Sequence, residues 1–293
     1  MELRQLEYFT AVARHGHFTR ASEELNVAQP AVSQQIKRLE AELGLELLRR
    51  STRRVELTEA GRTLLPRANR VLAEVEAARQ ELSEFGGMLR GTVEIGTLPV
   101  SSLDTPGLLE AFREIHPGIG LHLHEQSLAL LLPMLVNDQL DLLFALADPA
   151  GLDPRVEGLV LFQEELVVVL AEDHPLAGRK SMNLSTLVGE PLIRFRSGSA
   201  LQLAVEGEFD RAGVVPEFAF ETLELEMMRA LASRGLGIAL LPKGYLLREG
   251  PAVAAVPLRP RVRLPVSLMW RIDRRLPPAA RAFLDLALAR LGG

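Results

Sequence analysis

The chain has 293 residues, 47% of them hydrophobic and 24% charged, which is enough to bury more than one core and predicts two or three domains. It contains no cysteine, which excludes disulfide bonds, zinc sites built on thiolates and cysteine redox switches. Residues 1–90 carry 14 Lys and Arg against 13 Asp and Glu, and the rest of the chain carries 19 against 25, so the net charge of −5 comes from the rest of the chain. No apolar run is long enough for a membrane span, so we expect a soluble, cytoplasmic protein with no membrane partner.

The first 43 residues predict three helices. Residues 3–14 form an amphipathic pattern, residues 18–25 a short helix with Thr19 as its N-cap, and residues 29–43 a helix with Pro30 in its first turn. Four apolar residues at helical spacing predict the core face of this last helix: Val32, Ile36, Leu39 and Leu43. Its opposite face carries polar and cationic side chains suited to base edges and phosphates in a major groove: Gln29, Ser33, Gln34, Lys37 and Arg38.

Residues 47–57 predict a β-hairpin with apolar ends and four arginines in or beside its turn: Arg49, Arg50, Arg53 and Arg54. A cationic tip of this kind suits a phosphate backbone or a narrow minor groove. The alternative is a solvated arginine cluster, but the fixed offset from the helix-turn-helix pattern favours a DNA-binding wing. We predict that the following residues contact DNA: Thr19, Arg20, Gln29, Pro30, Ala31, Ser33, Gln34, Lys37, Arg38, Arg50, Arg53 and Arg54.

A long helical pattern follows the hairpin. Apolar residues recur at alternating steps of four and three, which is typical of a heptad seam: Leu64, Ala68, Val71, Val75, Ala78, Leu82 and Phe85. One interpretation is a linker helix that dimerises through the first six of these residues. The alternative is a single amphipathic helix packed on its own chain, but the length of the pattern and the Gly86-Gly87 break after it favour the linker helix.

From Arg90 onward, strands alternate with helices, which predicts an α/β domain with a mostly parallel sheet. Strands are predicted at 93–96, 121–124, 141–146, 166–170, 192–195, 218–222, 238–241 and 266–271. Helices are predicted at 106–116, 128–137, 201–212, 225–233 and 277–291. Because the last strand and helix are expected to return to the first unit, the pattern predicts two lobes joined by two crossovers.

Polar residues on loops between strands and helices are candidates for a ligand site between the lobes. They are Thr97, Ser101, Ser102, Ser127, Arg196, Ser197, Ser199 and Thr222. Hydroxyls and free N–H groups at helix starts favour an anion, so a metabolite bearing a carboxylate is expected. Each of these residues has the alternative role of a plain helix cap.

Neither a metal site nor a catalytic site is expected. His122 and His124 share one face of a predicted strand, but no third metal ligand is evident. No G-x-S-x-G, P-loop or H-E-x-x-H motif occurs, and no cofactor is expected.

The whole chain resembles the LysR-type transcriptional regulators. The N-terminal residues that carry the resemblance are Leu6, Phe9, Phe18, Ala21, Leu25, Gln29-Pro30-Ala31-Val32-Ser33, Ile36, Leu39-Glu40, Leu43-Gly44, Leu47, Arg50 and Leu57-Thr58-Glu59-Ala60-Gly61. Looser matches follow at 91–96, 140–142, 174–176 and 235–242. Two residues depart from the pattern, Ala28 where the family often has a capping serine and Gln34 where arginine is common, so the target sequence is not transferable from relatives.

The resemblance implies a multidomain α+β protein. An all-α winged helix-turn-helix would span 1–58 and a linker helix for dimerisation 59–87. A two-lobed α/β effector domain like the periplasmic binding proteins (type II) would span 91–293, with lobe I at about 91–161 and 267–293 and lobe II at about 162–266. The implied partners are double-stranded operator DNA, a small-molecule effector and a second chain, with homodimers assembling into a homotetramer. RNA polymerase is a further candidate partner.

Two classes of function remain to be separated. The first is a transcriptional regulator controlled by an effector. The second is a two-lobed protein that binds or converts a small molecule and carries a vestigial DNA-binding module. An intact wing and recognition face favour the regulator.

Overall fold

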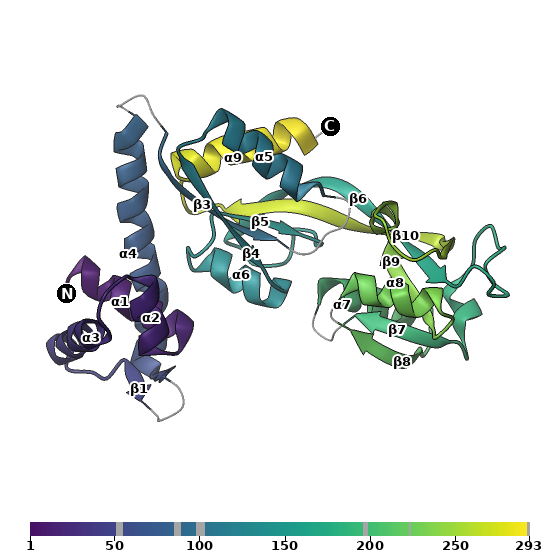
Figure 1. Ribbon diagram of the computed structural model, residues 1–293, viewed down its shortest axis with the longest axis horizontal. Helices are drawn as coiled ribbons and strands as arrows, with labels where there is room; N and C mark the ends of the chain where they lie inside the picture. The colour runs from purple at the N-terminus through teal and green to yellow at the C-terminus, as the bar shows by residue number, and fades with distance from the viewer. Residues whose placement is uncertain (51–54, 85–88, 98–102, 196–198, 223, 292–293) are drawn as a thin grey trace.

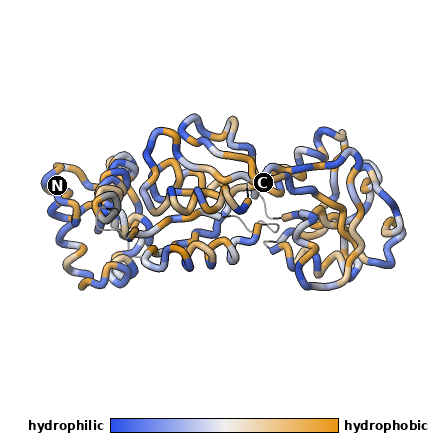
Figure 2. Tube along the Cα trace, turned by 90° about the horizontal axis from the view of Figure 1, so that it is seen from above, coloured by the Kyte–Doolittle hydropathy of each residue, from blue (hydrophilic) through white to orange (hydrophobic). Residues whose placement is uncertain are grey.

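The computed structural model describes residues 1–50, 55–84, 89–97, 103–195, 199–222 and 224–291. A small N-terminal head, one long helix and two lobes follow one another along an elongated molecule (Figure 1). Seen from above, the head, lobe I and lobe II lie in a row (Figure 2). Within these residues, none of the helices has the length and hydrophobicity needed to span a membrane.

The head contains α1 (Leu3–His15), α2 (Phe18–Glu24), α3 (Gln29–Leu43) and the antiparallel hairpin of β1 (Leu48–Arg50) and β2 (Val55–Leu57). The predicted helices and hairpin are therefore present. Val32, Ile36 and Leu39 are fully buried as predicted, but Leu43 is 38% exposed because the helix ends there, at Gly44 with φ 67°. The prediction of Thr19 as an N-cap is wrong, because α2 begins at Phe18 and His17 holds the capping position.

The long helix α4 (Glu59–Glu84) follows Thr58, whose Oγ1 accepts a hydrogen bond from Gly61 N–H at 3.0 Å. Gly61 is needed here, because a Cβ at this position would lie 2.2 Å from the Leu47 carbonyl oxygen. The first turns of α4 pack on the head, and Ala68 is only 1% exposed within the same hydrophobic cluster as α1. The compact head therefore extends beyond the predicted boundary at residue 58.

The burial of Ala68 corrects the predicted dimerisation seam. Ala68 and the half-buried Leu64 pack inside the head of their own chain, so Ala68 is not available to a partner helix. Farther along α4, the stripe opens to solvent, with Val71 43% exposed and Leu82 70% exposed. Residue Phe85 lies outside the described residues.

One eight-stranded sheet runs through both lobes in the order β4-β3-β5-β10-β6-β9-β7-β8. Lobe I holds β3 (Gly91–Thr97), α5 (Thr105–Ile115), β4 (Ile119–Glu125), α6 (Leu128–Val136), β5 (Leu142–Ala145) and α9 (Pro278–Leu291). Lobe II holds η1 (Leu184–Leu187), β7 (Pro191–Phe195), α7 (Ala200–Arg211), β8 (Glu217–Thr222), α8 (Leu225–Ser233), β9 (Ile238–Pro242) and η2 (Lys243–Leu247). The helices α5 and α9 lie together on lobe I in Figure 1, and α6 lies apart from them.

Two long strands, β6 (Val156–Leu170) and β10 (Ala254–Arg271), connect the lobes. The sequence predicted only the last part of each. Their pairing is antiparallel, as are the pairings β5–β10 and β6–β9 on either side, so the expectation of a mostly parallel sheet holds only for the outer pairs. Those outer pairs are β3–β4, β3–β5, β7–β8 and β7–β9.

The lobes have separate hydrophobic cores. Val262 and Leu264 of β10 belong to the core of lobe II, whereas Val266 and Leu268 belong to that of lobe I. Between the cores, only β6 and β10 pair, because β9 reaches β6 at Leu166 and β5 reaches β10 at Ser267. A register shift between Val266 and Ser267 marks this crossing.

Candidate nucleic-acid interface and ligand site

The exposed face of α3 is the candidate surface for nucleic acid. Gln34, Lys37 and Arg38 are exposed on it, while Ser33 is half-buried. Gln29, Pro30 and Ala31, in the first turn, are also exposed. Since Val32, Ile36 and Leu39 anchor the opposite side in the core, the polar face is held outward on a rigid helix.

Contacts within the head fix the position of α3 and of the hairpin. On α2, Glu24 pairs with Arg14 at 3.0 Å and with His15, which ties α2 to α1. On α3, Glu40 Oε1 accepts hydrogen bonds from the N–H groups of Leu47 and Leu48 at 2.9 and 3.2 Å, which holds β1 beside the helix. Sequence reasoning missed this role of Glu40, because an exposed-looking glutamate on a helix gives no signal of a contact seven residues away.

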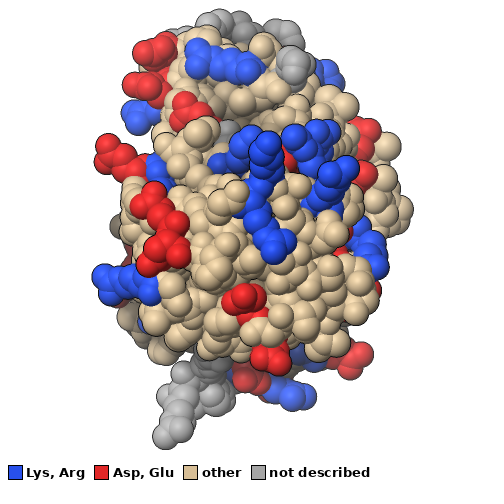
Figure 3. Space-filling view, turned by 90° about the vertical axis from the view of Figure 1, so that its right-hand side faces the viewer, with Lys and Arg blue, Asp and Glu red and all other residues tan. Residues whose placement is uncertain are grey.

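The hairpin places Arg49 opposite Glu56 and Arg50 opposite Val55. Of the predicted contacts, Arg53, Arg54 and the Arg50 side chain lie outside the described part of the chain. Thr19 and Arg20 are exposed on α2. Lys and Arg side chains also gather on the end of lobe II (Figure 3), so positive charge alone does not mark the DNA-binding face. What distinguishes α3 is its place in a helix-turn-helix.

The predicted effector residues divide between the two lobes. Thr97 ends β3 and is 4% exposed, with Phe144 of β5 beside it in the sheet register. Ser127 precedes α6 as its N-cap residue, but its side chain makes no capping hydrogen bond. The other predicted effector residues, Ser101, Ser102, Arg196 and Ser197, lie outside the described residues.

In lobe II, the candidate hydroxyls take part in local hydrogen bonds. Ser199 Oγ accepts from Gln202 N–H at 3.0 Å and so caps α7, while Thr222 Oγ1 accepts from Glu224 N–H at 3.3 Å. These bonds match the alternative role of a cap, and a hydroxyl engaged in this way has one lone pair fewer for a ligand.

The two histidines on β4 share one carboxylate. His122 Nδ1 lies 2.8 Å from Glu94 Oε1, and His124 Nε2 lies 2.6 Å from Glu94 Oε2. This pairing accounts for two histidines on one strand face. In the described ranges, no three His, Cys, Asp or Glu residues form a group that could hold a metal ion.

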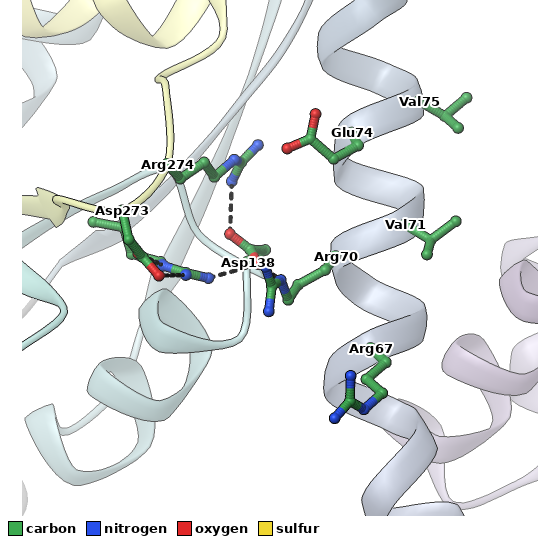
Figure 4. Close-up of a pocket in the computed structure, with 9 residues that line it drawn as sticks. Arg67, Arg70, Val71, Glu74, Val75, Asp138, Asp273 and Arg274 are labelled. Atoms are coloured by element: carbon green, nitrogen blue, oxygen red, sulfur yellow. Dashed lines mark hydrogen bonds and ion pairs between the residues drawn. The ribbon is translucent and has the colours of Figure 1, made fainter.

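A cavity of about 480 Å³ lies between α4 and lobe I (Figure 4). At its base, Arg271 Nη1 pairs with Asp138 Oδ2 at 2.7 Å, and Arg274 lies 3.4 Å from Asp138 and 3.5 Å from Asp141. Burial raises the pKa of Asp141 to about 6, against the opposing effect of the Arg274 charge. Sequence reasoning missed this cluster, whose only local signal is the run of charges after β10.

A helix-turn-helix head on a long helix, followed by two lobes joined by crossing strands, defines a class of DNA-binding regulators. Residues 3–62 match the family model for the bacterial regulatory helix-turn-helix protein, lysR family, and residues 86–292 match the LysR substrate binding domain. The chain belongs to the LysR family and is a DNA-binding transcriptional regulator with an effector-binding domain.

Relatives cover the whole chain. It is 32% identical to the DNA-binding transcriptional dual regulator OxyR of Escherichia coli over 298 residues, which is 100% of this chain and 97% of that protein. It is also 32% identical to the transcriptional activator CmpR of Synechocystis, over 98% of this chain and 95% of the relative.

The structural neighbours agree. A full-length OxyR from Pseudomonas aeruginosa has a TM-score of 0.77 and 26% identity, covering 98% of this chain and 95% of that one. Full-length CbnR complexed with its target DNA has a TM-score of 0.66 and 26% identity, covering 98% of both chains.

Proposed function

We propose that this regulator reads operator DNA with the exposed face of α3 and contacts the flanking backbone with its hairpin. The observation that carries the proposal is the division of α3 into a fully buried apolar face and an outward polar face of Gln29, Ser33, Gln34, Lys37 and Arg38. Amide side chains suit adenine edges and cations suit guanine or phosphate. The neighbour crystallised with target DNA has the same overall fold.

We further propose that a small anionic metabolite controls DNA binding from a site between the lobes. Ser127 supports this proposal, since its hydroxyl makes no capping hydrogen bond and it precedes α6, where free N–H groups favour an anion. Thr97, at the end of β3, and the residues 101, 102 and 196–199 complete the proposed site. One relative is named as a hydrogen peroxide-inducible genes activator. This chain contains no cysteine, so a response to peroxide through a thiol is not available to it.

The proposed assembly is a homodimer formed through the exposed stripe of α4, which pairs further into a homotetramer. RNA polymerase is its proposed partner at the promoter. The proposed activity is regulation and not catalysis, and its proposed place is the bacterial cytoplasm, where operator DNA lies.

Footprinting of the full chain on DNA upstream of its own gene tests the proposal. We expect a protected site whose affinity falls steeply with salt, because phosphate contacts release counterions. A screen of carboxylate metabolites by thermal shift, followed by footprinting with any compound that stabilises the protein, tests control by an effector. If the protein binds no sequence more tightly than bulk DNA, the reading head is vestigial.

A further inference from the structure

The cavity between α4 and lobe I is a meeting point of arginines from distant parts of the chain. Figure 4 shows Arg67, Arg70 and Glu74 pointing from α4 toward lobe I, while Val71 and Val75 point away from it. Across the cavity, Arg274 is only 10% exposed. The volume of about 480 Å³ falls within the range of small-molecule sites.

Most of the acidic groups around the cavity are already neutralised by one arginine. Arg271 donates to both carboxylate oxygens of Asp273 and also donates to Asp138 at 2.7 Å and to the Val136 carbonyl at 3.1 Å. The side chains of Arg271 and Asp138 are 5% and 3% exposed, so this arrangement is enclosed. It leaves Arg271 with little capacity for a ligand.

The other three arginines have fewer acceptors than a guanidinium can engage. Arg70 Nε is 3.9 Å from Asp138 Oδ2, too far for a hydrogen bond, and Arg274 meets Asp138 and Asp141 only at 3.4 and 3.5 Å. For Arg67, no ion pair or hydrogen bond is found within the described ranges. Glu74 also faces these arginines. Among the described carboxylates that line the cavity, it is the single one without a described partner.

We propose that this cavity is a second ligand site, which binds a small oxyanion bearing a carboxylate or phosphoryl group between Arg67 and Arg70 on α4 and Arg274 on lobe I. Planar guanidinium groups bind such oxyanions bidentately, and three of them can share the oxygens of one ligand. Arg67 and Arg70 are three residues apart on one helix face and can therefore act together.

A ligand held in this way connects the helix that carries the reading head to lobe I. Arg70 and Asp138 already form a long ion pair of 3.9 Å across this junction, and the oxyanion would add shorter bonds to it. The site is distinct from the proposed site between the lobes, and its occupancy is measurable without DNA or an effector, so failure of one proposal leaves the other standing.

Calorimetric titration of the full-length protein with potassium phosphate and with potassium citrate, against potassium chloride at matched ionic strength, tests the site. We expect saturable binding of at least one oxyanion. Saturation by phosphate alone identifies a phosphoryl ligand, and saturation by citrate alone identifies a carboxylate. If neither oxyanion gives saturable binding below about 10 mM, the proposal is overturned.

Variants locate the binding. Arg67→Gln with Arg70→Gln should weaken it roughly 10- to 100-fold per lost charge-assisted contact, whereas Glu74→Gln should tighten it by removing a competing carboxylate. Neither change removes a described short hydrogen bond, so folding is retained. The matched control is Arg79→Gln on the same helix, since Arg79 lies by Glu76 and outside the cavity, and it should bind as the unmodified chain does. Equal affinity in the double variant and the control would rule out the site.

Discussion

Asp138 and Arg271 form an ion pair of 2.7 Å between Oδ2 and Nη1, and their side chains are 3% and 5% exposed. Arg271 ends the crossing strand β10, while Asp138 follows α6 with a left-handed φ of 58°. The same guanidinium donates to the Val136 carbonyl in the last turn of α6. The pair therefore fastens the end of a strand that comes from lobe II to a helix terminus in lobe I.

Asp138→Asn should destabilise the protein by about 1–3 kcal/mol, because Arg271 and Arg274 lose a buried carboxylate partner, while Asp273 still pairs with Arg271. Asparagine tolerates the left-handed backbone, so the loss reports the charge. Urea unfolding measures it. Asp153→Asn is the control, since its partner Arg155 is half exposed and surface pairs contribute about 0–1 kcal/mol. Equal losses in the two variants would contradict a special role for the buried pair.

Asp141 should give the stability of the protein a specific pH dependence. Burial raises its pKa to about 6 from the ordinary 3.8, so the folded state holds a proton that the unfolded chain releases earlier. The stabilisation that protonated Asp141 contributes to the folded state is therefore fully present below pH 4 and is lost as the pH rises through 6.

The measurement compares unfolding of the unmodified protein with that of Asp141→Asn, which does not titrate. From pH 4 to 7, the difference in unfolding free energy should shift by roughly 2 kcal/mol in favour of the variant. If the difference stays constant over this range, folding does not raise the pKa of Asp141.

Two substitutions on α3 should separate base recognition from phosphate binding. Gln34→Ala should reduce the preference for operator over unrelated DNA by about 1–3 kcal/mol. Lys37→Ala should weaken binding to all DNA alike and lower the salt slope by about one. Quantitative footprinting at several salt concentrations distinguishes them, with Lys180→Ala on lobe II as the control. Unchanged operator preference in Gln34→Ala would remove this residue from the recognition surface.

The exposed stripe of α4 should form the dimer. Leu82→Asp changes a side chain that is 70% exposed, so the monomer should keep its fold. In a helix interface, the carboxylate would lose its hydration, and both dimerisation and operator binding should fail. Sedimentation velocity measures the association state, and Arg79→Ala on the same helix serves as the control. A dimer that survives Leu82→Asp would place the interface elsewhere.

Local patterns predicted the elements of the head well, because α3 combines apolar periodicity, Pro30 in its first turn and Gly44 at its end. The full length of β10 was not predictable in this way. Its prolines, Pro257, Pro260 and Pro265, argue against a central strand. The strand accommodates the first two because its register with β6 shifts between Pro257 and Val262.

The candidate sites show a second limit of sequence reasoning. A heptad pattern identifies buried positions but does not say which chain buries them, and Ala68 proves to be buried by its own head. Asp138 and Arg271 are 133 residues apart in sequence, and only the folded sheet brings them together. Helix-start serines such as Ser199 fit both a cap and a ligand contact, and its hydrogen bond to Gln202 became visible only in the structure.

The crossing of β6 and β10 has a mechanical consequence. Over the stretch where Arg263, Leu264 and Pro265 pair with Glu165, Glu164 and Gln163, the sheet is only two strands wide. Two-stranded ribbons twist more than wide sheets, and a register shift beside the ribbon bends it further. A change in the angle between the lobes would therefore be concentrated in this ribbon, where only two strands would have to twist.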